Sequence, residues 1–218
     1  SMPLGRLWRS AMKKVELATW ERREIYELFS ACDHPFYSLS LELDVTNLYR
    51  YTHERGVSFY YSLCWLMTRA MEQVEAFRMR IRGDELVVVD ELVPSCTDLA
   101  PGSDAFVIVT LPHGGDMDAF CRRAKEKAAG QMYLFDKEME RLDTLIYFSC
   151  LPWFPVTGFV TERNLEVDDS IPRVTWGKYR REGEHVTLNI TLDLNHRLID
   201  GVHIGKLYQM LQKMIELL

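Results

Sequence analysis

A histidine followed four residues later by an aspartate stands near the C-terminal end of the chain. Residues 195–201 read Asn-His-Arg-Leu-Ile-Asp-Gly. An imidazole, whose ordinary pKa is about 6.5, is largely neutral at neutral pH and can accept a proton from a hydroxyl group. His196 is therefore a candidate general base, and a histidine simply hydrogen-bonded in the core is the alternative. Asp200 is a plausible N-cap for a following helix.

The segments on either side of this pattern predict the elements that position it. Residues 186–194 alternate apolar and polar side chains without a break, which is typical of a strand with one buried face. His196 continues the apolar parity, so we expect its ring to point inward, as Leu192 and Leu194 do. From Gly201 onward apolar residues recur at three- and four-residue spacing, which predicts an amphipathic C-terminal helix.

The rest of the chain alternates predicted helices with predicted strands. Helices are expected over 21–30, over 59–76, and from Asp116 or Asp118 to Ala129. Strands are expected over 39–45, 78–82, 85–90, 145–149 and 173–179 in addition to 186–194. This order predicts an α/β fold, a mixed β-sheet with helices packed on it.

Four other segments stand in the order and at the spacings of one enzyme family. They read Trp-Glu-Arg-Arg-Glu at 20–24, Phe-Arg-Met-Arg-Ile followed by Asp-Glu-Leu within 77–86, Phe-Ser-Cys-Leu-Pro-Trp at 148–153, and Ile-Pro-Arg-Val-Thr-Trp-Gly-Lys-Tyr at 171–179. With the His-x-x-x-Asp-Gly pattern, they resemble the chloramphenicol acetyltransferase family of the CoA-dependent acyltransferase superfamily. The resemblance implies a single domain of that fold over residues 17–218, after an N-terminal arm at residues 1–16.

The resemblance also implies the catalytic roles. It implies an acetyl-CoA-dependent O-acetyltransferase in which His196 deprotonates an acceptor hydroxyl for direct attack on the thioester. Ser149 matches a serine that donates a hydrogen bond to the oxyanion, and Thr175 matches a threonine that holds a water molecule beside the intermediate. Both residues would also suit ordinary strand positions. Arg22 and Asp200 match a structural ion pair between the N-terminal helix and the catalytic loop.

Other positions bear on the two substrates. Lys178 and Tyr179 match residues beside the nucleotide end of CoA, where a cation suits a phosphate and a ring offers a stacking surface. At positions that the resemblance assigns to the acceptor pocket, Phe106 matches an aromatic residue of the family, whereas Phe29 replaces a tyrosine whose hydroxyl contacts chloramphenicol. The stretch 32–36 carries a charge and an imidazole where the family has an apolar loop. The sequence therefore does not identify the acceptor, and it does not decide whether antibiotic resistance is the biological role.

Two alternatives to a chloramphenicol-acetylating enzyme follow. One is an acyltransferase with a different small-molecule acceptor, and the other is a non-catalytic ligand-binding relative. The sequence of residues 195–201 also resembles that of the 2-oxo acid dehydrogenase acyltransferases. This branch is disfavoured because no lipoyl domain or linker is seen. The family resemblance further implies a homotrimer with active sites at subunit interfaces.

Composition agrees with this interpretation. The 218 residues can build one large core, and no Gly/Ser- or Pro-rich linker divides them. A formal net charge of −6 argues against a nucleic-acid surface, and no stretch approaches the roughly 20 apolar residues of a membrane span. Five cysteines without a Cys-x-x-Cys pair predict free thiols in a reducing compartment, hence a cytoplasmic protein. No Cys/His spacing suits a metal ion, so no metal is expected. The family resemblance implies acetyl-CoA as the co-substrate.

Overall fold

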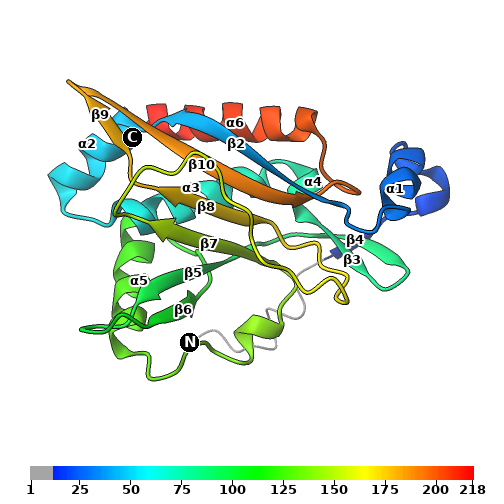
Figure 1. Ribbon diagram of the computed structural model, residues 1–218, viewed down its shortest axis with the longest axis horizontal. Coiled ribbons are helices and arrows are strands. Elements are labelled where there is room, and N and C mark those ends of the chain that lie inside the picture. Colours follow the sequence, from blue (N-terminus) through cyan, green and yellow to red (C-terminus); the bar gives the residue numbers. More distant parts are fainter. Residues whose placement is uncertain (1–11) are drawn as a thin grey trace.

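Two β-sheets organise residues 12–218, the part of the chain that the computed structural model describes (Figure 1). The larger sheet has the strand order β2-β10-β8-β7-β5-β6, with β9 paired to β10, and the smaller has the order β1-β4-β3. The strands are β1 (Met12–Lys14), β2 (Phe36–Asp44), β3 (Met79–Arg82), β4 (Glu85–Val89), β5 (Val93–Leu99), β6 (Phe106–Thr110), β7 (Leu145–Leu151), β8 (Arg173–Gly177), β9 (Arg180–Glu182) and β10 (His185–Asn195).

The larger sheet is mixed, as the sequence predicts. Strands β5, β7 and β8 run parallel to one another, and the other pairings are antiparallel. The helices are α1 (Arg23–Ser30), α2 (Thr46–Arg55), α3 (Phe59–Glu72), α4 (Glu75–Arg78), α5 (Met117–Gly130) and α6 (Gly201–Glu216), and the 3-10 turns are η2 (Leu17–Thr19) and η3 (Met139–Arg141). Among them, no helix is long and apolar enough to cross a membrane.

The two faces of the larger sheet differ in chemistry because strand side chains alternate. Along β10 every second residue from Val186 to Leu194 joins the main core with apolar residues of α3, α5 and α6. The opposite face carries polar side chains, among them Thr175 on β8 and Ser149 on β7. Residues 152–172, drawn in yellow in Figure 1, lie over this polar face, where Gly158 approaches Ser40.

Most predicted elements are present, with differences at their ends. The helix expected over 59–76 is two helices, because the chain leaves helical geometry at Val74 between α3 and α4. Asp116, and not Asp118, caps α5, since its carboxylate accepts a hydrogen bond of 2.7 Å from the Ala119 amide. The strand expected over 173–179 ends at Gly177. Helix α2 and strands β5 and β6 were not predicted.

The end of the predicted N-terminal arm is paired with the domain. Met12–Lys14 forms β1 against β4, and the Val15 amide donates a hydrogen bond of 2.8 Å to the Leu86 carbonyl. Residues 1–11 of the predicted arm lie outside the described residues.

Candidate active site

The His196 ring lies in an aromatic sandwich at the end of β10. It stacks on Phe29 of α1 with ring centroids 3.7 Å apart, and the Tyr37 ring of β2 lies against it at 4.3 Å. The His196 amide donates to the Pro35 carbonyl at 2.7 Å, which fixes the backbone. The sequence did not single out Tyr37, whose place beside the ring follows only from its pairing with Leu194.

The expectation that His196 points inward is wrong in part. Strand β10 ends at Asn195, so the alternation stops one residue before the histidine, which begins a turn. The ring is 34% exposed, and Nε2 lies 3.6 Å from Asp200 Oδ1, beyond hydrogen-bond distance. No side chain of the described residues forms a hydrogen bond with the ring, so its nitrogens are available to an incoming hydroxyl group.

Arg22 and Asp200 lie in contact beneath this ring. The Arg22 guanidinium donates to Asp200 Oδ2 from Nε at 3.1 Å and from Nη2 at 2.7 Å, and to the Arg197 carbonyl at 3.0 Å. The carboxylate side chain is 26% exposed and the guanidinium 11%. Asp200 is also the N-cap of α6, and its amide donates to His203 Nδ1 at 2.9 Å. Burial lowers the pKa of His203, which keeps that nitrogen free to accept.

Ser149 and Thr175 are neighbours on the polar face of the sheet. They occupy paired positions on β7 and β8. The Thr97 hydroxyl of β5 donates to Ser149 Oγ at 3.2 Å, so the Ser149 proton can point elsewhere. The sequence did not predict β5 and therefore missed Thr97. The next residue, Cys150, is not a competing nucleophile, because burial raises the pKa of its thiol to about 12.

Lys178 and Tyr179 follow β8 at the end of the sheet remote from His196. Lys178 is exposed, and its amide donates to the Phe154 carbonyl at 2.8 Å. The Tyr179 ring packs edge-on against Tyr49 at 5.3 Å and against Phe59 at 5.2 Å, and burial raises the pKa of its hydroxyl. An exposed ammonium beside an anchored aromatic ring suits a phosphate and a nucleobase.

These residues form two separate groups within one chain. The His196 group consists of His196, Phe29, Arg22 and Asp200, and the Ser149 group of Ser149, Thr175, Lys178 and Tyr179. Thr175 pairs with Thr191, so His196 lies five residues farther along β10, about 16 Å. Ser149 lies two strands away from β10, about 10 Å to the side. A general base acts at about 3 Å, so one chain does not bring the two groups to one substrate.

Phe106 is separated from the His196 group even farther. It begins β6, the edge strand opposite β2, and is 53% exposed. Four strand spacings lie between β6 and β10, about 19 Å. Phe106 and Phe29 therefore do not line one pocket within a single chain.

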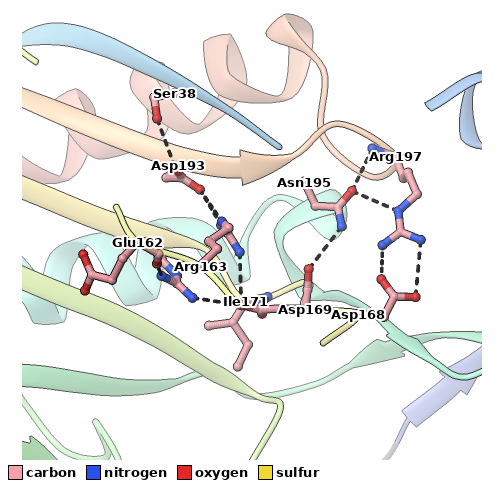
Figure 2. Close-up of polar contacts among 10 residues, drawn as sticks. Ser38, Glu162, Arg163, Asp168, Asp169, Ile171, Asp193, Asn195 and Arg197 are labelled. Atoms are coloured by element: carbon pink, nitrogen blue, oxygen red, sulfur yellow. Dashed lines mark hydrogen bonds and ion pairs between the residues drawn. The ribbon is translucent and has the colours of Figure 1, made fainter. Parts of the chain in front are cut away.

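A buried set of ion pairs beside these residues was missed by the sequence analysis. The Arg–Asp cluster consists of Arg163, Asp169, Arg173 and Asp193, and Figure 2 shows how the guanidinium groups bridge the carboxylates. Asn195 joins the cluster to the turn that carries His196, because its Nδ2 donates to the Asp169 carbonyl at 3.2 Å and its Oδ1 accepts from the Arg197 amide at 3.0 Å. The four charges are scattered over residues without a period, which leaves no sequence signal for the cluster.

Gly177, the last residue of β8, lies directly against the backbone of residues 154–156. A Cβ built there would lie 2.6 Å from the Phe154 carbonyl oxygen and 2.7 Å from the Val156 amide. Backbone atoms at this distance cannot move aside as a flexible side chain would. The residue therefore has to be glycine for residues 154–156 to cross the end of β8.

We expect a Gly177→Ala substitution to destabilise the protein by about 1–3 kcal/mol, the usual cost of an inserted methyl group in packed surroundings. The check is urea unfolding of both proteins, with Gly114→Ala as the control, because a Cβ at this exposed glycine meets no atom within 4 Å and, as at Gly177, no positive φ is involved. A free energy of unfolding equal to that of the parent would show that residues 154–156 give way easily.

The described residues contain no group of three or more His, Cys, Asp or Glu side chains arranged to hold a metal ion. All five cysteines are free, at Cys32, Cys64, Cys96, Cys121 and Cys150.

Known proteins are similar to this chain in both sequence and architecture. The chain is 26% identical to chloramphenicol acetyltransferase 3 of Escherichia coli over 212 residues, 92% of this chain and 95% of that protein. It is 29% identical to chloramphenicol acetyltransferase of Staphylococcus aureus over 205 residues, 92% of this chain and 94% of that protein.

Solved structures show the same fold. A chloramphenicol acetyltransferase superposes with a TM-score of 0.83 at 21% identity, covering 94% of this chain and all of the other. A probable dihydrolipoamide acetyltransferase from Listeria monocytogenes gives a TM-score of 0.63 at 15% identity, covering 94% of each chain. The model of one sequence family, described as chloramphenicol acetyltransferase, matches residues 11–212. The chain thus belongs to the chloramphenicol acetyltransferase family and is an acyltransferase.

Proposed function

We propose that the protein transfers an acetyl group from acetyl-CoA to a hydroxyl group of a small molecule, with His196 as general base. The observation that carries the proposal is the His196 ring, which packs against two aromatic rings while about a third of its side chain stays exposed. A general base needs this combination of fixed orientation and access. Five free cysteines support a reducing compartment such as the cytoplasm as the place of action.

The reaction needs no covalent acyl-enzyme. His196 takes the proton of the acceptor hydroxyl while its oxygen attacks the thioester carbonyl carbon. Ser149 donates a hydrogen bond to the resulting oxyanion, and Thr175 holds a water molecule beside it. When the tetrahedral intermediate collapses, the C–S bond breaks and the imidazolium returns its proton to the CoA thiolate. Lys178 and Tyr179 hold the nucleotide end of the thioester.

The separation of the two groups implies that the centre lies between subunits. We place the His196 group of one protomer opposite the Ser149 group of the next. Such a contact joins two different surfaces, and repeating it closes a ring, which in a trimer gives three centres. Exposed apolar side chains on the segment over the polar face suit burial in that contact; they are Trp153, Phe154, Val160, Leu165 and Val167.

Complementation between two inactive variants tests the shared centre. His196→Ala lacks the base and Ser149→Ala lacks the oxyanion donor, so each pure variant is expected to be strongly impaired. After the two are unfolded together in equal amounts and refolded at random, each mixed trimer has one centre with an intact His196 and an intact Ser149, which is about one quarter of all centres when the unmixed rings are included. We therefore expect thiol release from acetyl-CoA to recover to about that fraction of the parent rate.

Controls make the result specific. Each variant refolded alone shows whether refolding itself changes activity, and mixing the folded variants without unfolding shows whether subunits exchange. Recovery in the co-refolded sample alone supports a shared centre. Co-refolded protein that is mixed by mass spectrometry yet no more active than the separate variants would place both residues in one chain's own centre.

A further inference from the structure

The Arg–Asp cluster lies on the same sheet face as Ser149 and Thr175. Arg173 precedes Thr175 by two residues on β8, so both side chains project from one face, about 7 Å apart. Asp193 of β10 and Tyr147 of β7 occupy the positions paired with Arg173 on its two sides. An acceptor whose hydroxyl group reacts beside Thr175 would therefore place the atoms next to that hydroxyl group near this cluster.

The cluster is a closed set of ion pairs under the segment 152–172. Arg163 Nη1 lies 3.0 Å from Asp169 Oδ2, and Arg163 also pairs with Asp193. Arg173 Nη2 lies 3.1 Å from the same Asp169 oxygen. The Ser38 hydroxyl donates to Asp193 Oδ2 at 3.0 Å. The Arg163 guanidinium lies over the Phe36 ring, 3.8 Å from its centroid, which covers an aromatic surface with a charged group.

The charges of the cluster balance, two guanidinium groups against two carboxylates. A balanced set gives no net attraction for an anionic or a cationic acceptor. It does present hydrogen-bond donors and acceptors together, which a hydroxyl group can match because it both donates and accepts. An apolar aromatic acceptor would cover these groups without replacing their contacts with water.

One donor of the cluster is left without a partner. Arg173 Nη1 donates to the Glu162 carbonyl and Nη2 to Asp169, but the buried Nε has no hydrogen-bond partner among the described residues. The Arg173 side chain is 19% exposed, the largest exposure among the four. A buried N–H is normally paired in a folded protein, so an acceptor oxygen that reaches this nitrogen beside Thr175 would supply the missing partner.

We propose that the Arg–Asp cluster selects an uncharged, hydroxyl-rich acceptor, such as a sugar or another polyol, with Arg173 Nε donating to one of its oxygens. This inference rests on the proposed acetyl transfer, since it assumes that the acceptor reacts beside Ser149 and Thr175. It assigns Arg173 as a residue that determines specificity and takes no part in the proton transfer.

The test compares two alcohols that each carry one primary hydroxyl group, methyl β-glucoside and 2-phenylethanol. Thiol release from acetyl-CoA is measured for the parent, for Arg173→Lys and for Arg173→Met. Arg173→Lys keeps a charge beside Asp169 and removes the Nε donor, whereas Arg173→Met removes both. Arg82→Met is the matched control, because Arg82 of β3 pairs with Asp143 and not with a carboxylate of the cluster.

The parent is expected to favour methyl β-glucoside over 2-phenylethanol by at least about tenfold in kcat/KM. Arg173→Lys should reduce this preference about tenfold, the effect of one hydrogen bond to a charged group, and should do so through the KM of the glucoside. The KM of acetyl-CoA stays unchanged in every variant. Arg82→Met keeps the preference of the parent.

Three results would overturn the inference. They are a parent that favours 2-phenylethanol, an Arg173→Lys variant with the parent's preference, and a parallel fall of activity on both alcohols, which a merely structural role predicts. Calorimetric binding of the two alcohols without acetyl-CoA separates this inference from the proposed function. Glucoside binding that depends on Arg173 in a protein without turnover would reject acetyl transfer and support the selective cluster. Rapid transfer to 2-phenylethanol would support acetyl transfer and reject the selective cluster.

Discussion

Replacement of His196 by alanine is expected to lower kcat/KM for acetyl transfer by about a thousandfold, within the range that general bases contribute. The loss should fall on kcat, because the acceptor hydroxyl keeps its proton as it approaches the thioester. The KM of acetyl-CoA should change little, since Lys178 and Tyr179 lie at the other end of the sheet. Steady-state kinetics in which acetyl-CoA is varied at a saturating concentration of the acceptor measure both quantities.

His185→Ala is the matched control for this substitution. His185 begins β10 as His196 follows its end, and its side chain is 59% exposed beside Asp44 at 3.7 Å. It has no role in the proposed reaction, so the parent rate is expected. A His196→Ala enzyme that retained a tenth or more of the parent kcat would remove the imidazole from the mechanism.

The second large effect is expected from Asp200→Asn. Removal of one partner of a buried ion pair usually costs 3–5 kcal/mol, and Asp200 is a quarter exposed, so we expect about 3 kcal/mol of lost stability. The rate should fall as well, because the Arg22 guanidinium holds both Asp200 and the Arg197 carbonyl next to the base. Chemical unfolding and initial rates on the same preparation give the two values.

The exposed pair Arg23–Glu27 on α1 provides the comparison. Both side chains are more than half exposed, and Glu27→Gln is expected to change neither stability nor rate measurably, as is usual for surface pairs. A melting temperature and an activity equal to those of the parent in Asp200→Asn would show that the Arg22 contact is dispensable.

The sequence predicts the elements whose periodicity is strong. The alternation of residues 186–194 gives β10, and the three- and four-residue spacing after Gly201 gives α6. It fails for α2, which buries only Leu48 and Thr52 and so has hardly any apolar stripe. It also fails for β5 and β6, because both carry buried hydroxyl side chains such as Ser95 and Thr110, and β5 contains Pro94.

The candidate site is predicted in its parts and missed in its arrangement. Family motifs single out His196, Ser149 and Thr175, but no local pattern states which strands pair. Only the register of β10 with β8 shows that His196 and Ser149 are far apart in one chain. The Arg–Asp cluster depends on the same register, since Asp193 and Arg173 occupy paired positions on neighbouring strands although they lie 20 positions apart in the sequence.

The length of β10 has a consequence for how this enzyme can change over time. In the arrangement we propose, His196 follows the last residue of this long strand and lies too far from Ser149 and Thr175 of its own chain, so the base and these residues meet only across a boundary between copies. A mutation beside Ser149 or Thr175 then changes the reaction that the base of the neighbouring copy performs. Natural selection would accordingly act on the whole ring and not on one chain.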